Sequence, residues 1–88
     1  MAFLEEEKYR PDFTVEIVER NPDLYVFLTE KKYEAKEKDE IWFFVKYSED
    51  NKIKFVSRNA DLKIEYVDKK YKAGWKNKKH KLVNRISK

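Results

Sequence analysis

The sequence contains no cysteine and only one histidine among its 88 residues. The missing thiols exclude a disulfide framework, and the residues present include no usual set of zinc ligands. There is also no glycine-rich loop of the kind that holds phosphates. We therefore expect neither a bound metal nor a cofactor. With one glycine and two prolines, most turns must be formed by asparagine, aspartate, lysine and serine.

No apolar run approaches the length of a membrane span. The first four residues run directly into Glu5, Glu6 and Glu7, which differs from a secretory signal. We expect a soluble cytoplasmic protein with no membrane partner. The three serines lie in no nucleophile motif, and the carboxylates lie in runs typical of solvated segments. We therefore predict that the protein is not an enzyme.

The chain is long enough for one domain with a small core. Charged residues make up 43% of it, but fourteen aromatic residues argue against disorder. We expect residues 1–11 to be a flexible acidic tail that ends at Pro11, and residues 12–88 to be the domain. A single helical turn from Phe3 to Lys8 is the alternative for the tail.

One stretch of the sequence occurs twice. Arg20-Asn21-Pro22-Asp23-Leu24 returns 38 positions later as Arg58-Asn59-Ala60-Asp61-Leu62. From Val15 to Lys36 the same offset gives nine identities, where composition alone would give about two. We expect equivalent environments for Asp23 and Asp61, with each carboxylate accepting local backbone N–H groups. Tyr33 and Tyr71 should likewise make the same contacts.

Apolar residues alternate with polar ones along short segments, which predicts β-strands and an all-β fold. The expected strands cover residues 13–17, 24–29, 41–47, 53–57 and 62–66, with a last one containing Leu82, Val83 and Ile86. The strands share one pattern of apolar residues, and the first residue of this pattern is Val15, Val26, Ile41, Ile53 or Ile64. The steps between these residues are 11, 15, 12 and 11 positions, and the charged loop at 36–40 accounts for the long one. This spacing suits a sandwich or barrel, and a winding structure fits it equally well.

Three features resemble the septoil-knot domain family, a group of small uncharacterised proteins. They are Ala60-Asp61, the stretch Ile41-Trp42-Phe43-Phe44, and the closing Tyr71-Lys72-Ala73-Gly74-Trp75-Lys76-Asn77-Lys78. The sequence departs from the family pattern at Ala35-Lys36 and Asn51-Lys52. The resemblance implies a small all-β domain of strand-turn units that wind round each other into a deep torus-type knot. It brings no catalytic or binding residues. Wound strands leave few open edges, so we expect a monomer.

Positive charge is concentrated at the end of the sequence, where residues 69–88 contain nine lysines or arginines and no acid. Lysines neutralise phosphates and an exposed indole stacks on a base, so this segment is the candidate polyanion site. Its residues are Tyr71, Trp75, Lys76, Lys78, Lys79, His80 and Lys81. The alternative is a solvated basic loop in which Trp75 covers the core beside a positive-φ turn at Gly74 and His80 is a bystander. A further alternative is that the base composition of the genome accounts for part of the lysine excess.

Two functional hypotheses follow. The first is a non-catalytic, kinetically stable structural or interaction domain. The second is a single-stranded nucleic-acid-binding module that uses the basic aromatic segment at the end of the sequence.

Overall fold

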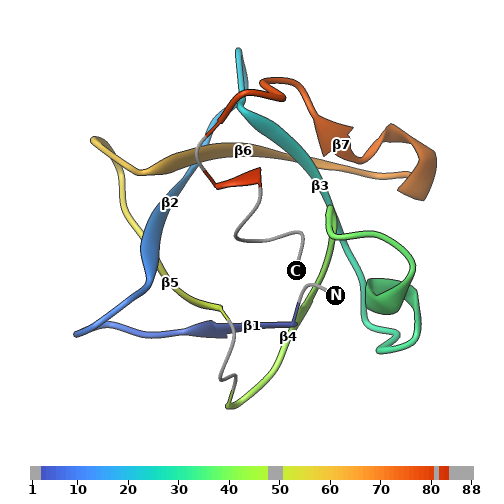
Figure 1. Cartoon of the computed structure of the whole chain (residues 1–88), viewed down its shortest axis with the longest axis horizontal. Coiled ribbons are helices and arrows are strands. Elements are labelled where there is room, and N and C mark those ends of the chain that lie inside the picture. Colours follow the sequence, from blue (N-terminus) through green and yellow to red (C-terminus); the bar gives the residue numbers. More distant parts are fainter. Residues whose placement is uncertain (1–2, 48–50, 81, 84–88) are drawn as a thin grey trace.

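The computed structural model describes residues 3–47, 51–80, 82 and 83, and the predicted all-β fold is confirmed. Six parallel strands form a closed barrel, and a two-residue strand adds to it antiparallel (Figure 1). The strands are β1 (Phe3–Glu6), β2 (Phe13–Ile17), β3 (Leu24–Leu28), β4 (Ile41–Phe44), β5 (Lys52–Phe55), β6 (Leu62–Val67) and β7 (Gly74–Trp75). Two short 3₁₀ helices, η1 (Glu34–Lys36) and η2 (Lys70–Lys72), lie in the connections.

The chain passes round the barrel twice. Strands β1 to β3 make the first lap and β4 to β6 the second, as the colours of Figure 1 show. The order of strands round the barrel is β4-β1-β5-β2-β6-β3, and β3 pairs with β4 to close it. Each second-lap strand therefore lies between two first-lap strands, as β5 does between β1 and β2.

The 38-residue repeat corresponds to one lap. Strands β2 and β3 contain the first copy, β5 and β6 contain the second, and the copies are paired in parallel as β2–β5 and β3–β6. The same offset relates Leu4 of β1 to Trp42 of β4, and these two strands are also paired. The predicted barrel and the predicted winding are thus the same structure.

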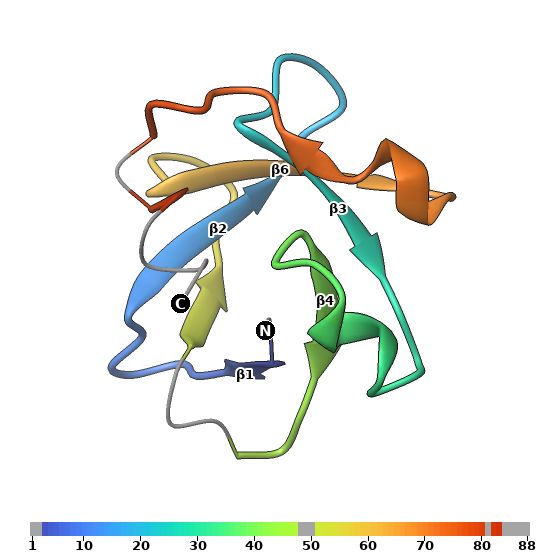
Figure 2. The ribbon, with the colours of Figure 1, turned by 45° about the vertical axis from the view of Figure 1, so that its right-hand side comes forward.

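Each of the six barrel strands contributes a fully buried side chain to the core, and β3 and β6 contribute a second one, Leu24 and Leu62. The corresponding residues of the six strands are Leu4, Val15, Val26, Trp42, Ile53 and Ile64. On β4 the expected match between Ile41 and Val15 is wrong, because Trp42 takes the inward place. Phe44, two residues further on, pairs with Leu4 and so faces inward as well. Ile41 is buried on the outer side, where η1 packs against β4 (Figure 2).

The N-terminal segment is not a tail, which corrects the expectation for residues 1–11. Phe3–Glu6 form β1, which lies between β4 and β5, and Leu4 is 0% exposed. The barrel closes only with this strand in place. The domain therefore begins by residue 3 rather than at residue 12.

The asparagine of the repeated turn has a positive φ in both copies. Asn21 and Asn59 have φ values of 53° and 57°, in the left-handed region that asparagine tolerates. The predicted positive φ at Gly74 is wrong, because this glycine lies in β7 and pairs in an extended conformation with Tyr25.

The aspartates of the repeated turns fasten one lap to the other. The Asp23 carboxylate accepts the N–H of Lys63 at 3.1 Å, and the Asp61 carboxylate accepts the N–H of Thr14 at 3.0 Å. The equivalence of the two residues is confirmed, but these bonds reach across the barrel and not within the turn as expected, since both partners lie more than 35 residues away. Asp12, at the start of β2, makes the same bond to Lys52 at 2.8 Å.

The predicted last strand is not formed by its described residues. Leu82 and Val83 lie outside any strand, although Leu82 is buried in the core, and Ile86 lies outside the described residues.

Candidate functional site

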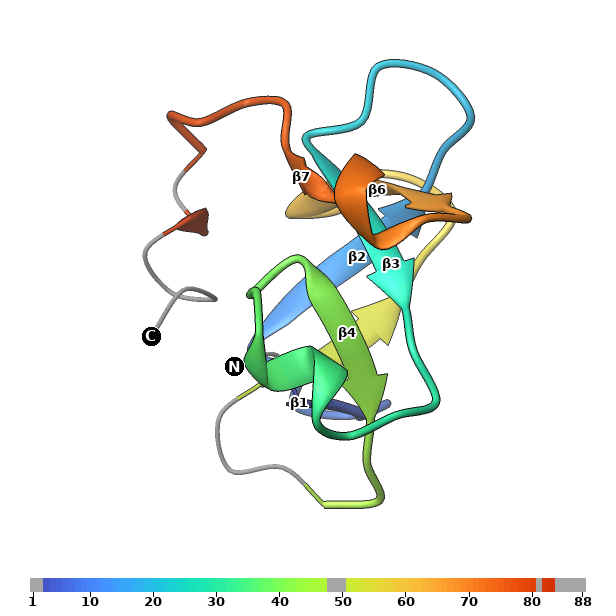
Figure 3. The same cartoon turned by 90° about the vertical axis from the view of Figure 1, so that its right-hand side faces the viewer.

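All six barrel strands run the same way, so the barrel has an amino end and a carboxyl end. In Figure 3 the strands β2 and β3 run from left to right. Residues 76–80 lie on the left, the turns that follow β2 and β6 project to the right, and η1, in the connection after β3, lies back toward the left. The two ends present different chemistry.

The basic segment predicted as the polyanion site lies at the amino end. The N–H groups of Lys76 and Asn77 both donate to the carbonyl of Asp23, at 2.9 and 3.0 Å, and these bonds fix the path of the chain. The side chains of Lys76, Lys78 and Lys79 are exposed.

Trp75 covers part of the core. Its side chain is half-buried and packs against the central cluster, and its ring centroid lies 5.8 Å from that of His80. The indole N–H is buried and finds no acceptor in the described part of the chain. This position matches the alternative in which Trp75 covers the core, and it leaves little of the indole for stacking on a base.

His80 is a structural residue, so the expectation of an exposed side chain in a solvated loop is wrong. Its side chain is 11% exposed, and Nε2 lies 2.9 Å from the carbonyl oxygen of Asp61. The N–H of Leu82 donates to Nδ1 at 3.1 Å, which places the ring proton on Nε2. Nε2 also lies 3.6 Å from the Asp23 carboxylate. The imidazole thus contacts both copies of the repeated turn.

The remaining predicted residues are not gathered at this place. Tyr71 belongs to η2, on the connection that follows β6, and is 80% exposed. Lys81 lies outside the described residues.

The carboxyl end of the barrel is an open apolar mouth. The last inward-facing residue of each strand reaches it, namely Glu6, Ile17, Leu28, Phe44, Phe55 and Tyr66. Five of these, with Val45, line a hollow of about 430 Å³. Ile17 and Leu28 are 54% and 48% exposed, although they continue the inward faces of β2 and β3. Apolar surface left open in this way favours a binding site.

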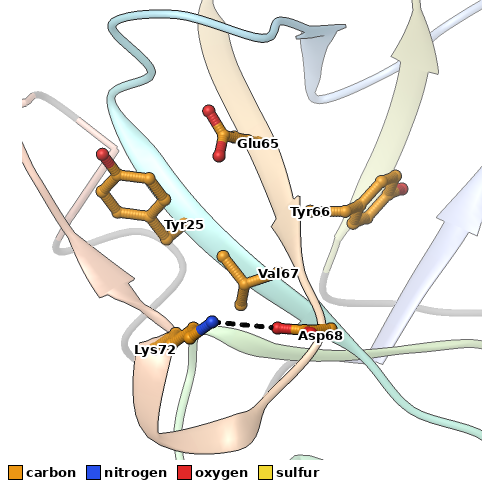
Figure 4. Close-up of a pocket in the computed structure, with 6 residues that line it drawn as sticks. All are labelled: Tyr25, Glu65, Tyr66, Val67, Asp68 and Lys72. Carbon is orange, nitrogen blue, oxygen red and sulfur yellow. Dashed lines mark hydrogen bonds and ion pairs between the residues drawn. The ribbon is translucent and has the colours of Figure 1, made fainter.

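Tyr66 also lines a second hollow, of about 510 Å³, on the outer side of β6 (Figure 4). Burial raises the pKa of the Tyr66 phenol, and the charge of Glu6 adds to the effect. In Figure 4 an ion pair of 3.2 Å between Lys72 and Asp68 closes one side of this hollow. The phenol therefore remains protonated at neutral pH and is able to donate a hydrogen bond.

Four turns after the strands carry strongly exposed tyrosines, each preceded by a lysine. Tyr9, Tyr33, Tyr47 and Tyr71 are 88%, 61%, 80% and 80% exposed. The 38-residue offset relates Tyr9 to Tyr47 and Tyr33 to Tyr71. These four tyrosines were not predicted as a set from the sequence, although the recurrence of Lys-Tyr at the offset of one lap was a signal for them.

One corner of the molecule, which we call the twin-tyrosine corner, brings residues 29–37 and 67–73 together. Lys70 lies 2.8 Å from Glu34 and 3.3 Å from Glu37, and Nζ of Lys38 donates to the carbonyl of Ala73 at 3.0 Å. Tyr33 and Tyr71 directly adjoin the members of the Glu34–Lys70 pair.

Glu34 anchors this corner from inside. It is 9% exposed and accepts a hydrogen bond from the hydroxyl of Thr29. Hydrogen bonds from Lys70 and then Thr29 lower the pKa of Glu34, and the bond to Glu34 raises the pKa of Lys70. Both groups are therefore charged at neutral pH, and the pair holds the two turns at fixed positions.

Within residues 3–47, 51–80, 82 and 83, no group of three or more histidine or acidic side chains is placed to hold a metal ion. The same residues contain no helix that is long and apolar enough to span a membrane.

Residues 3–76 match the 7(1) septoil knot domain. No curated protein matches the chain. The match covers all seven strands and the closing Gly74-Trp75, and the interlaced order of the strands agrees with a chain wound twice round one axis. Membership of this family implies a knotted chain. The protein belongs to the septoil knot domain family.

Proposed function

We propose that the domain is a non-catalytic, kinetically stable interaction module that binds through the carboxyl end of its barrel. The observation that carries this proposal is the exposure of Tyr9, Tyr33, Tyr47 and Tyr71 on the turns at that end. The core does not use these side chains. Exposed aromatic residues on rigid turns supply contact area at a low cost in entropy, which suits a binding surface.

The interlaced strands support the kinetic part of the proposal. A second-lap strand leaves its place only when hydrogen bonds to two first-lap strands break, as for β5 between β1 and β2. The transition state for unfolding must therefore lose much of the barrel at once. The pairing of strands round the closed barrel also supports a monomer, which we propose together with a cytoplasmic location.

Two measurements test the proposal. Stopped-flow unfolding in denaturant should give slow unfolding, and complete unfolding within milliseconds would contradict kinetic stability. Crosslinking in native cells should then be compared between the wild type, a variant with all four exposed tyrosines changed to serine, and a variant with Lys76, Lys78 and Lys79 changed to serine. Crosslinks lost only in the tyrosine variant support the carboxyl end as the binding surface. Crosslinks unchanged in it contradict the proposal.

A second candidate is single-stranded nucleic-acid binding through the basic segment at the amino end. The exposure of Lys76, Lys78 and Lys79 on a backbone fixed by Asp23 favours it, because such lysines can follow a phosphate chain. Binding of oligonucleotides that weakens steeply with salt and in the triple-lysine variant would support this candidate. Binding unaffected by the three substitutions would exclude it.

A further inference from the structure

We infer that the twin-tyrosine corner binds single-stranded nucleic acid, with Tyr33 and Tyr71 as stacking surfaces for unpaired bases. This inference rests on the proposed function and names the partner class for part of the same surface. It places nucleic-acid binding on a surface other than the basic segment, residues 76–80.

The geometry of the corner provides two aromatic rings on connected supports. Lys70 bonds to Glu34 across the two turns, and each of these residues is the chain neighbour of one tyrosine. Tyr33 and Tyr71 are also equivalent by the 38-residue repeat, so the corner presents the same side chain from each lap. With exposures of 61% and 80%, both rings are accessible to a ligand.

The charge of the corner suits a phosphate chain. Residues 29–37 and 67–73 contain six lysines and four acidic side chains, a balance of +2. Lys31, Lys32 and Lys69 are exposed and lie within two residues of a tyrosine in the chain, whereas the buried Glu34 is neutralised by Lys70. Lysines beside exposed aromatic rings are the combination that binds single strands with little sequence preference.

The basic segment and the twin-tyrosine corner differ in what they offer a base. At the amino end Trp75 packs on the core and against the ring of His80, so its lysines act without an accessible aromatic ring. At the twin-tyrosine corner the rings are free of the core. A duplex offers no unpaired bases to them, so preference for single strands is expected.

The test uses the full chain and fluorescence anisotropy with a labelled 15-nucleotide oligothymidine at low salt. Changing both Tyr33 and Tyr71 to alanine should weaken binding by about fivefold or more per tyrosine, and changing both to phenylalanine should restore it. The matched control changes Tyr9 and Tyr47, the other pair related by one lap, to alanine. This control should bind like the wild type. Circular dichroism spectra of all variants should be unchanged.

Three results would overturn the inference. They are equal losses in the two tyrosine pairs, a larger loss on changing Lys78 and Lys79 to alanine, and competition by polyglutamate or a DNA duplex as effective as that by the unlabelled strand. The polyglutamate result would instead indicate an acidic protein partner. Absence of oligothymidine binding would also overturn it. The proposed function then stands if the cellular crosslinks still depend on the four tyrosines, and it fails if they do not.

Discussion

The Nε2 atom of His80 lies 2.9 Å from the carbonyl oxygen of Asp61, 19 residues earlier in the chain. Through this bond, and through the N–H of Leu82 on its other ring nitrogen, the imidazole holds the basic segment over the amino end of the barrel. The His80 side chain, although lysines flank it in the sequence, thus helps to hold the fold together.

Replacing His80 by alanine should lower the free energy of unfolding by about 1–3 kcal/mol, because it leaves the Asp61 carbonyl and the Leu82 N–H without their partner. Equilibrium unfolding in urea measures the change. Lys79→Ala is the matched control, since this neighbouring side chain is exposed, and should change stability by less than about 0.5 kcal/mol. Equal effects of the two substitutions would contradict the structural role of His80.

Two isoleucines that pair across neighbouring strands should differ in how much stability is lost when each is truncated to alanine. Ile64 and Ile17 are partners in the register of β6 and β2, but Ile64 is 0% and Ile17 is 54% exposed. Ile64→Ala should cost about 2–5 kcal/mol because it opens a cavity in the central layer. Ile17→Ala should cost less than about 1 kcal/mol, because solvent already reaches the site. Chemical denaturation measures the loss of unfolding free energy in both variants. Similar losses would contradict a barrel with a closed centre and an open carboxyl end.

Stability should fall in acid through Glu34. Its pKa lies below the ordinary value of 4.5, so the folded state binds this proton less readily than the unfolded chain does. Its contribution is complete above about pH 4.5 and is lost as the pH falls through the lowered pKa of the folded state. Lys70 has a raised pKa, so its contribution persists at neutral pH and is lost only in strong alkali.

Thermal unfolding from pH 7 to pH 2 tests this behaviour. Glu34→Gln should be less stable than the wild type at pH 7 and should lose less stability on acidification. Glu30→Gln, an exposed neighbour, serves as the control and should follow the wild-type profile. A wild-type profile in Glu34→Gln would show that the pair with Lys70 does not stabilise the fold.

Substitution by alanine should be tolerated at Gly74 and should destabilise the protein at Asn59. A Cβ at Gly74 would meet nothing within 4 Å, and its φ is not positive. Gly74→Ala should therefore be neutral or stabilising by up to about 1 kcal/mol, through loss of freedom in the unfolded chain. Asn59→Ala, at a φ of 57°, should instead cost about 1–2 kcal/mol. Urea unfolding measures the stability of both variants. A larger loss of stability in Gly74→Ala than in Asn59→Ala would contradict the described backbone.

Much of the barrel was predictable from the sequence, because its strands have local signatures. Alternation along residues 13–17 and 62–66 gave strands at those places, and the repeated Asn-x-Asp gave equivalent turns. The family resemblance gave the winding, which no local pattern specifies.

The elements that were missed depend on partners distant in the chain. Phe3–Glu6 is a strand because β4 and β5, which follow about 40 and about 50 residues later, flank it. The run of glutamates concealed its two apolar residues. On β4, Ile41 and Trp42 are both apolar, and the choice of which one faces inward depends on the register with β1 and on η1 outside. The role of His80 depends on Asp61 and Leu82, which no spacing rule connects to a histidine.

The interlacing of the two laps also fixes the number of sequence copies that the fold accepts. In an open solenoid another repeat stacks on the end, and such families vary freely in length. Here the second copy occupies each gap left by the first, and β3 pairs with β4 to close the barrel. A third copy of 38 residues would find no vacant place between the strands. A fold of this kind therefore accepts two copies of the repeated sequence and cannot grow by adding a third.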